Sequence, residues 1–349
     1  MLENNSFSML VCSAAAAFFG LGFYFGVAQV EGDLAVVLLS MSLVTLALTP
    51  YLLFVFGTTD ISSAALLIIL SGLLRSAYLA LICRGLHMDE VAAVLAPMVA
   101  MAIAGTLLSE AILGAGGVAL EPLEAVAATL AVVGAVFMAG RLWFDPSLPV
   151  AVDQVEVGFD DIESNADEVQ FDENPFVSRG PKLTVRKPSA RDLATGSSRR
   201  HAVVLGAMAG MALGLGLGLD RKGCAAMDGQ CTGFVAISLV VTQAALWPLV
   251  GRLTAGGGTP PAEHSLIRLV FIGCAGMLAN FWLATAMDMG SDASGSASVM
   301  VVYASISALS AVPTRCGFGE SKRDVLCIVG GLLILLGSAV AAAALLWGA

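Results

Sequence analysis

The chain contains apolar segments of about 20 residues that follow one another along most of its length. A hydrocarbon core about 30 Å thick needs about 20 mainly apolar residues per helix, so each segment is long enough to span a bilayer. Only 13% of the 349 residues are charged, whereas about a quarter are charged in a soluble domain. The segments therefore predict an all-α, multi-pass integral membrane protein of the plasma membrane or an internal membrane, in contact with the lipid bilayer.

Charged residues, Gly, Pro and Asp divide the apolar sequence into ten predicted transmembrane helices. The first five lie near residues 7–27, 34–56, 61–83, 91–113 and 124–143, and the other five near 202–219, 232–253, 266–287, 297–318 and 325–347. The polar region between the two series is acidic at first and basic later, which is typical of a disordered linker. We thus predict a first five-helix repeat at 1–143, a cytosolic linker at 144–200 and a second five-helix repeat at 201–349.

Lysine and arginine are distributed unequally between the two predicted sides of the membrane. One side receives Arg221 and Lys222, whereas the other receives the basic residues of the linker and of most other loops. Because cytoplasmic loops hold the excess of basic residues, the linker is predicted in the cytosol and both termini outside or in a lumen. Cys224 and Cys231, after the sixth span, would then lie in an oxidising compartment and either form a disulfide or remain free thiols.

Arg75 lies well inside the third predicted span. An arginine near the bilayer centre costs about 2.5 to 3.5 kcal/mol on insertion scales. At 1.5 Å per residue it is about 13 Å from the cytosolic end, too far to snorkel comfortably. A wet cavity or a polar partner is therefore needed. Arg75 either recognises an anion in a substrate path or makes a structural hydrogen bond to neighbouring carbonyls or to Ser71.

Further polar and aromatic residues fall near the middle of predicted spans. Gln243 lies in span seven, and Asn280 and Trp282 lie in span eight, where lipid-facing polar side chains would be costly. We expect them to face inward, as part of a binding cavity or as hydrogen bonds between helices. Tyr78 and Tyr303 occupy similar levels in spans three and nine, where they either line the same cavity or pack in the core.

The sixth span carries a glycine at every fourth position, which places all of them on one helix face. These residues are Gly206, Gly210, Gly214 and Gly218. The spacing predicts that another helix approaches closely, in a packing or sliding contact; the same face would also serve homodimerisation.

Short sequence patterns recur in the two halves in the same order. Residues 107–110 match 316–320 in ending an apolar run with a small residue and Glu, residues 127–134 match 330–337, and residues 78–80 match 282–284. At these residues the chain resembles the drug/metabolite transporter superfamily, EamA type. The match is best at Gly319 and Glu320 with Gly330, Gly331 and Gly337. The first half has Ser109 before Glu110 instead, and span nine lacks a counterpart of Pro97 in span four.

The resemblance implies a transporter with a central cavity that opens alternately to each side. An odd number of spans per repeat inverts the second half, so Glu110 and Glu320 are predicted near opposite membrane faces, as gate or helix-end residues. We therefore expect a secondary transporter of a small organic solute, such as an anionic metabolite or a nucleotide sugar. The alternative is a membrane receptor or scaffold that recruits partners through its central loop.

The sequence contains no His-rich cluster, Asp-rich metal motif or Ser/His/Asp arrangement. We accordingly expect no enzyme activity, no catalytic residues, no metal and no cofactor, and we expect no nucleic-acid partner.

Overall fold

The computed structural model describes residues 2–28, 34–56, 62–88, 91–113, 120–144, 190–227, 231–255, 266–289, 294–315 and 322–347. These residues form ten α-helices and one 3-10 turn. The elements are α1 (Leu2–Ala28), α2 (Leu34–Phe56), η1 (Ser62–Ala64), α3 (Ala65–Met88), α4 (Val91–Leu113), α5 (Pro122–Phe144), α6 (Ala190–Ala226), α7 (Cys231–Ala255), α8 (Leu266–Met289), α9 (Ser294–Arg315) and α10 (Lys322–Trp347). The part of the chain that the structure describes is thus all-helical.

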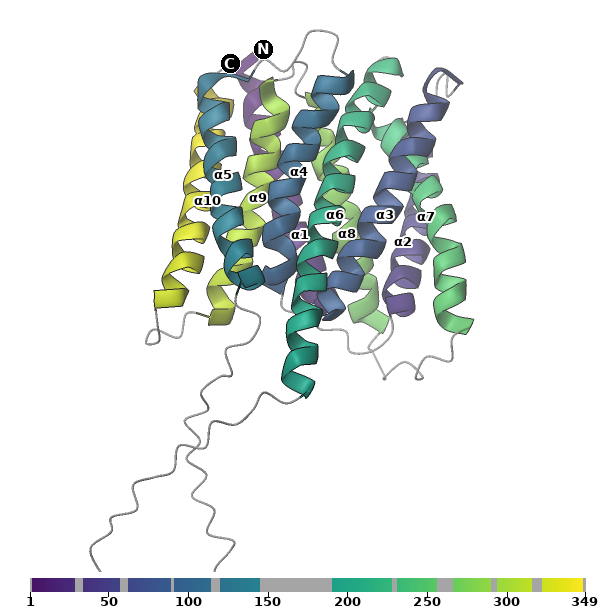
Figure 1. The fold of residues 1–349 in the computed structure, drawn as a ribbon. Coiled ribbons are helices and arrows are strands. Elements are labelled where there is room, and N and C mark those ends of the chain that lie inside the picture. The colour runs from purple at the N-terminus through teal and green to yellow at the C-terminus, as the bar shows by residue number, and fades with distance from the viewer. Residues whose placement is uncertain are drawn as a thin grey trace, which may run out of the picture.

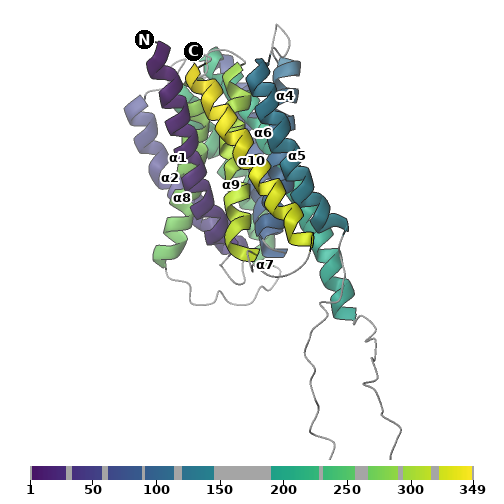
Figure 2. The same ribbon diagram turned by 90° about the vertical axis from the view of Figure 1, so that its left-hand side faces the viewer.

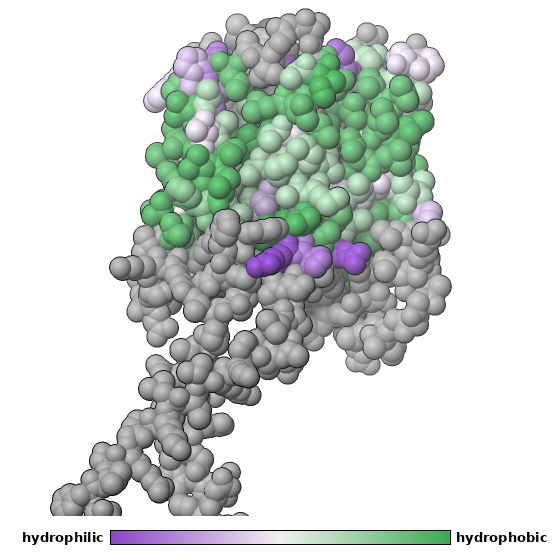
Figure 3. Space-filling model, viewed as in Figure 1, coloured by the Kyte–Doolittle hydropathy of each residue, from purple (hydrophilic) through white to green (hydrophobic). Residues whose placement is uncertain are grey.

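Seven stretches of the described helices are long and apolar enough to cross a membrane, and α2, α7 and α9 each contain a shorter apolar stretch. Large apolar side chains such as Phe18, Phe54 and Ile267 are exposed on the outside of the bundle. On the face drawn in the space-filling view, the middle of the bundle is mostly apolar, with polar residues above and below it (Figure 3). Such a surface is stable only against lipid, so the chain is a multi-pass membrane protein.

Prolines lie in the interior of α2, α4 and α7, at Pro50, Pro97 and Pro248. Proline removes one backbone hydrogen bond from a helix. Helices within a membrane tolerate this because neighbouring helices and side chains satisfy the freed carbonyl groups. The prolines therefore do not divide these helices into shorter elements.

The helices lie side by side in one bundle, and the two chain ends lie at the same end of it (Figure 1). The last residues of α5 and the first residues of α6 lie at the opposite end (Figures 1 and 2). Helix α6 packs against α3 and α4, α1 packs against α8 and α9, and α5 packs against α10. The largest buried apolar cluster joins α1, α3, α4 and α9, with Tyr24, Leu95 and Ile306 among its members.

Helix α6 is longer than the sequence predicts at both ends. It begins at Ala190, so residues 190–200, predicted as linker, are helical. It also continues past Leu219, where the predicted span ends, to Ala226. The rest of the predicted linker, residues 145–189, lies outside the described residues. The extension at the second end places Asp220 inside the helix.

The glycine face of α6 is covered by α4. A Cβ atom added to any of the four glycines would overlap an atom of α4. For Gly206, Gly210, Gly214 and Gly218 these atoms belong, in order, to the carbonyl groups of Val94, Met98 and Ala102 and to the side chain of Ser109. The two backbones approach as closely as glycine permits. Because α4 of the same chain occupies this face, it is not free to bind a second copy.

Candidate functional site

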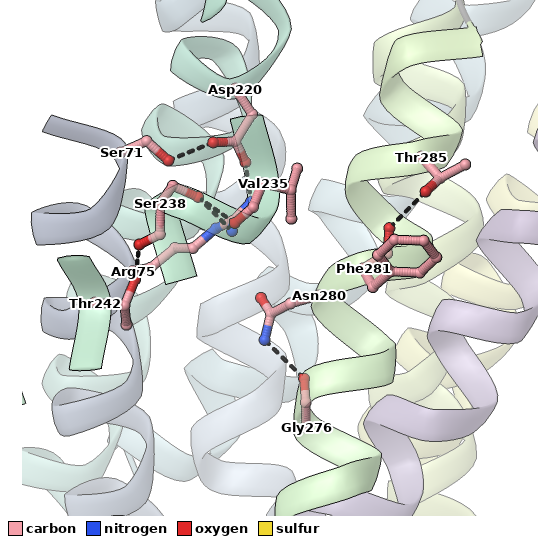
Figure 4. Close-up of polar contacts among 10 residues, drawn as sticks. All are labelled: Ser71, Arg75, Asp220, Val235, Ser238, Thr242, Gly276, Asn280, Phe281 and Thr285. Carbon is pink, nitrogen blue, oxygen red and sulfur yellow. Dashed lines mark hydrogen bonds and ion pairs between the residues drawn. The ribbon is translucent and has the colours of Figure 1, made fainter. Parts of the chain in front are cut away.

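Arg75 forms an ion pair with Asp220 inside the helix bundle. The guanidinium Nη2 of Arg75, on α3, contacts carboxylate Oδ2 of Asp220, on α6; their side chains are 4% and 1% exposed. Oδ1 of Asp220 accepts a hydrogen bond from the Ser71 hydroxyl. Nη1 of Arg75 donates to Oγ of Ser238, on α7, at 3.0 Å, and that hydroxyl donates to the carbonyl oxygen of Val235 at 2.9 Å (Figure 4). We call Ser71, Arg75, Asp220 and Ser238 the ion-pair cluster.

The local sequence explains why these groups meet. Ser71 and Arg75 are four residues apart on α3, so their side chains lie on the same helix face. Each charge alone would be costly inside a membrane, by about 2.5 to 3.5 kcal/mol on insertion scales. Pairing makes the cluster neutral, and the hydroxyls of Ser71 and Ser238 satisfy further hydrogen bonds of the pair. Arg75 thus has the polar partner that its position requires, and that partner is a carboxylate.

Asp220 was missed by sequence reasoning, which placed it in the loop with Arg221 and Lys222. A three-residue match in the sequence is a signal for its position, although residues 214–216 repeat it in another register. Residues 216–218 read Gly-Leu-Gly, with Asp220 two positions later, and residues 20–22 read the same, with Tyr24 two positions later. Because residues 20–24 lie inside a predicted span, the matching segment indicates that Asp220 is also inside one.

A second polar cluster consists of three buried tyrosines. The hydroxyl of Tyr24, on α1, is 2.6 Å from that of Tyr78, on α3, and 2.7 Å from that of Tyr303, on α9. It also lies 3.8 Å from Sδ of Met98, on α4. We call Tyr24, Tyr78 and Tyr303 the tyrosine cluster. The structure brings the two predicted tyrosines together through Tyr24, a residue that sequence reasoning did not select.

The two clusters are neighbours on α3. Ser71, Arg75 and Tyr78 are spaced four and three residues apart, so they lie along one face of that helix. Arg75 and Tyr78 differ in height by about 4.5 Å at 1.5 Å per residue. This face of α3 therefore presents a cation, a hydroxyl and a phenol to helices α1, α6 and α7.

Gln243 joins α7 to α2. Its Oε1 accepts a hydrogen bond from the Ser42 hydroxyl at 2.5 Å, and its Nε2 donates to Oγ1 of Thr45 at 3.3 Å. All three side chains are buried. The inward position expected for Gln243 is therefore observed, and its two hydrogen bonds join helix α7 to helix α2.

Asn280 and Trp282 are only partly buried on α8. Nδ2 of Asn280 donates to the carbonyl oxygen of Gly276, on the same helix, at 2.8 Å. Figure 4 shows its side chain pointing from α8 in the direction of the ion-pair cluster. Trp282 packs edge-on against Phe281, with ring centroids 5.7 Å apart. The described contacts do not join either residue to Arg75.

Glu110 is paired with a cation at the end of its helix. Its Oε1 lies 2.7 Å from Nη1 of Arg221, and both side chains are partly buried. Lys222 donates to the carbonyl oxygen of Leu113, the last residue of α4, at 2.9 Å. Cations at a helix C-terminus satisfy free carbonyls and interact favourably with the helix dipole. These contacts correspond to the helix-end interpretation of Glu110; Glu320 lies outside the described residues.

A further buried carboxylate, Glu124, lies near the start of α5. Its Oε1 accepts a hydrogen bond from Ser298, on α9, at 2.9 Å, and its Oε2 accepts one from the backbone N–H of Glu121 at 3.3 Å. A carboxylate that accepts from the first backbone N–H groups caps a helix N-terminus. Glu124 therefore fixes the start of α5 to α9.

Cys224, one helical turn after Asp220, is disulfide-bonded. The side chain of Cys231 lies outside the described side chains, so the pairing of these two cysteines stays a prediction. Within the part of the chain that the structure describes, no three His, Cys, Asp or Glu residues are grouped so as to hold a metal ion.

No known protein family matches the sequence of this chain, and no curated protein matches it significantly. A solved crystal structure of another protein aligns with it over 98% of each chain, with a TM-score of 0.55 and 13% sequence identity. At such low identity the likeness shows a shared fold alone. The fold and the site together define a multi-pass, α-helical membrane protein with a buried ion pair in its core. The resemblance to the drug/metabolite transporter superfamily stays a prediction.

Proposed function

We propose that the chain is a secondary transporter, built from ten transmembrane helices in two inverted five-helix halves, that moves a small organic solute by alternating access. The observation that carries the proposal is the buried ion pair between Arg75 and Asp220. Ionisable residues within a membrane are costly, and they commonly mark substrate or ion pathways. In this proposal α1 to α5 form the first half and α6 to α10 the second.

The contacts between helices support the division into two equivalent halves. Exchanging each helix with the one five places further along the chain turns the most extensive contacts between helices into other observed contacts. The contact of α1 with α8 becomes that of α6 with α3, α2 with α8 becomes α7 with α3, and α1 with α9 becomes α6 with α4. The contacts of α2 with α7, α4 with α9 and α5 with α10 become themselves. Such an exchange is expected of two repeats related by a twofold axis.

The direction of the chain supports inversion of the second half. The first residues of α1 and the first residues of α6 lie at opposite ends of the bundle (Figure 1). Five spans per half would produce this arrangement, because an odd number of crossings leaves the chain on the other side. The Gly-Leu-Gly segments at residues 20–22 and 216–218 would then occupy equivalent places in the two halves.

The position of the ion-pair cluster supports its use in transport. Ser71 and Arg75 belong to the first proposed half, whereas Asp220 and Ser238 belong to the second. Substrate sites of inverted-repeat transporters lie where the two halves meet. A cluster that joins the halves also changes when one half moves relative to the other. We therefore assign solute recognition to Arg75 and the surrounding hydroxyls, with a carboxylate or phosphate group on the solute.

The proposal is tested with purified protein reconstituted into lipid vesicles. A defined mixture of small carboxylates, phosphates and nucleotide sugars is added, and the vesicle contents are measured by mass spectrometry. Wild-type vesicles should accumulate at least one anion that protein-free vesicles exclude, and R75A should reduce that uptake at least tenfold. The matched control is R221A, which removes an arginine from an ion pair at a helix end. Equal entry into wild-type, R75A and protein-free vesicles would contradict the proposal.

A further inference from the structure

We propose that the place of the Asp220 carboxylate is itself the binding site for a carboxylate group of the solute, and that Asp220 and the solute compete for Arg75. The inference rests on the proposed function and names the chemical group that the site takes. Asp220 is paired with Arg75, the same cation that a transported anion would need to bind. The ion-pair cluster is thus a carboxylate-binding site that the side chain of Asp220 fills.

The donors of the site match a carboxylate. Each oxygen of Asp220 has one donor: Oδ1 accepts from Ser71 and Oδ2 from Arg75. The two donors are one helical turn apart on α3, so they hold a planar group with two oxygens. A phosphate would bring at least one more charged oxygen than these two donors satisfy. We therefore expect a carboxylate in preference to a phosphate.

Competition follows from charge and burial. Arg75 and Asp220 are nearly inaccessible to solvent, with side-chain exposures of 4% and 1%, and together they are neutral. A second carboxylate beside the same guanidinium would leave a net negative charge in a buried site, which is strongly unfavourable. A solute carboxylate therefore binds Arg75 only when Asp220 has left it.

The arrangement of the helices allows Asp220 to leave while its donors stay together. Ser71 and Arg75 are on α3, whereas Asp220 is on α6, about 9 Å along the helix before its last residue, Ala226. A displacement of α6 relative to α3 moves the carboxylate and leaves the two donors in register. The vacated place then has the same partners for an external carboxylate.

The test supplies the missing carboxylate from solution. D220A leaves Arg75 buried without its carboxylate partner, so acetate should bind and raise the apparent melting temperature of this variant in detergent, in a saturable manner. Acetamide, which has the same shape without the charge, should not. Chloride at the same ionic strength is the salt control. The double variant R75A/D220A is the matched protein control and should show no difference between acetate and acetamide.

Each result decides the inference. A saturable acetate effect in D220A that R75A/D220A lacks supports it, and an acetate effect of the same size in both variants, or in neither, overturns it. If D220A does not fold, D220S replaces it, because serine also vacates the place of the carboxylate and brings no charge for Arg75; the same acetate effect is expected.

A further probe separates the carboxylate site from a site for zwitterions. Stabilisation of the wild type by glycine that needs both Arg75 and Asp220 would assign the pair to a zwitterion and contradict the competition. The melting experiment needs no transport, so failure of uptake in vesicles and failure of acetate binding are independent results.

Discussion

Tyr24 and Asp220 follow the same three-residue segment in two different helices, and both contact the same third helix. Each lies two residues after a Gly-Leu-Gly segment, Tyr24 on α1 and Asp220 on α6. The hydroxyl of Tyr24 is 2.6 Å from that of Tyr78, and the carboxylate of Asp220 contacts Arg75; both partners are on α3. The same face of α3 thus contacts a neutral group of α1 through Tyr78 and a charged group of α6 through Arg75.

Removing either member of the buried ion pair should destabilise the protein. R75A and D220A should each lower the free energy of unfolding by about 3 to 5 kcal/mol, because each leaves an uncompensated buried charge. The double variant R75A/D220A should lose less stability than the sum of the losses of the two single variants. Reversible unfolding in mixed micelles, followed by circular dichroism, measures all three. The pair of Glu110 and Arg221 is the matched control: it is partly exposed, so its coupling should be about 1 kcal/mol or less. Additive losses for R75A and D220A would contradict the observed pairing.

The hydroxyl of Tyr24 should contribute more to the stability of the protein than the hydroxyl of Tyr303. Y24F removes the hydroxyl that lies 2.6 Å from that of Tyr78 and 2.7 Å from that of Tyr303, whereas Y303F removes only one of these two contacts. We expect Y24F to lower the free energy of unfolding by about 1 to 3 kcal/mol and Y303F to lower it by about 1 kcal/mol. The same unfolding experiment checks both variants. A larger loss for Y303F than for Y24F would show that Tyr24 does not hold the cluster together.

The contact between α6 and α4 should not accept a methyl group. A Cβ at position 210 would overlap the backbone of Met98, which cannot rotate away as a side chain can. G210A should therefore cost at least about 1 to 3 kcal/mol, the usual range for overpacking. G331A is the control, because a Cβ on Gly331 would meet nothing within 4 Å. It should leave stability unchanged or raise it by up to about 1 kcal/mol through better helix propensity. Melting temperatures in detergent compare the two, and equal values would contradict the close contact.

The amide of Gln243 should act between helices, whereas that of Asn280 should not. Q243L removes the bonds to Ser42 and Thr45, on α2, and should cost about 0.5 to 1.5 kcal/mol, as interhelical hydrogen bonds in membranes do. N280L removes a bond to Gly276 of the same helix and should have a smaller effect on stability. Thermal unfolding of both variants tests the difference. A larger loss for N280L would show that the Asn280 amide makes an interhelical contact.

The fold class could be predicted from the sequence because length and hydrophobicity alone define a helix that spans lipid. The predicted span at 91–113 coincides with α4, and the span at 34–56 with α2. The ends of α6 could not be predicted in the same way. Asp220, Arg221 and Lys222 are three charged residues in succession, which is typical of a loop, and only the tertiary partner of Asp220 explains why the helix continues through it.

The site could be predicted only in part. Arg75 was recognisable because a charge inside an apolar span needs a partner, but a sequence does not say which helix provides it. Tyr24 was not recognisable, because a tyrosine at its depth in α1 is an ordinary core residue until Tyr78 and Tyr303 are seen beside it. Contacts between distant helices depend on packing, and the chain separates Tyr24 from Tyr303 by 279 residues.

The common face of Ser71, Arg75 and Tyr78 makes α3 sensitive to changes in length. An α-helix turns by about 100° per residue, since one turn contains 3.6 residues. A single residue inserted before Ser71 and absorbed within the helix would rotate all three side chains away from their partners, which lie on three other helices. Both clusters would be lost in one step, although every residue that forms them would still be encoded. In a scan of single-residue insertions along the gene, we therefore expect functional variants with insertions in the loops and none with insertions in α3.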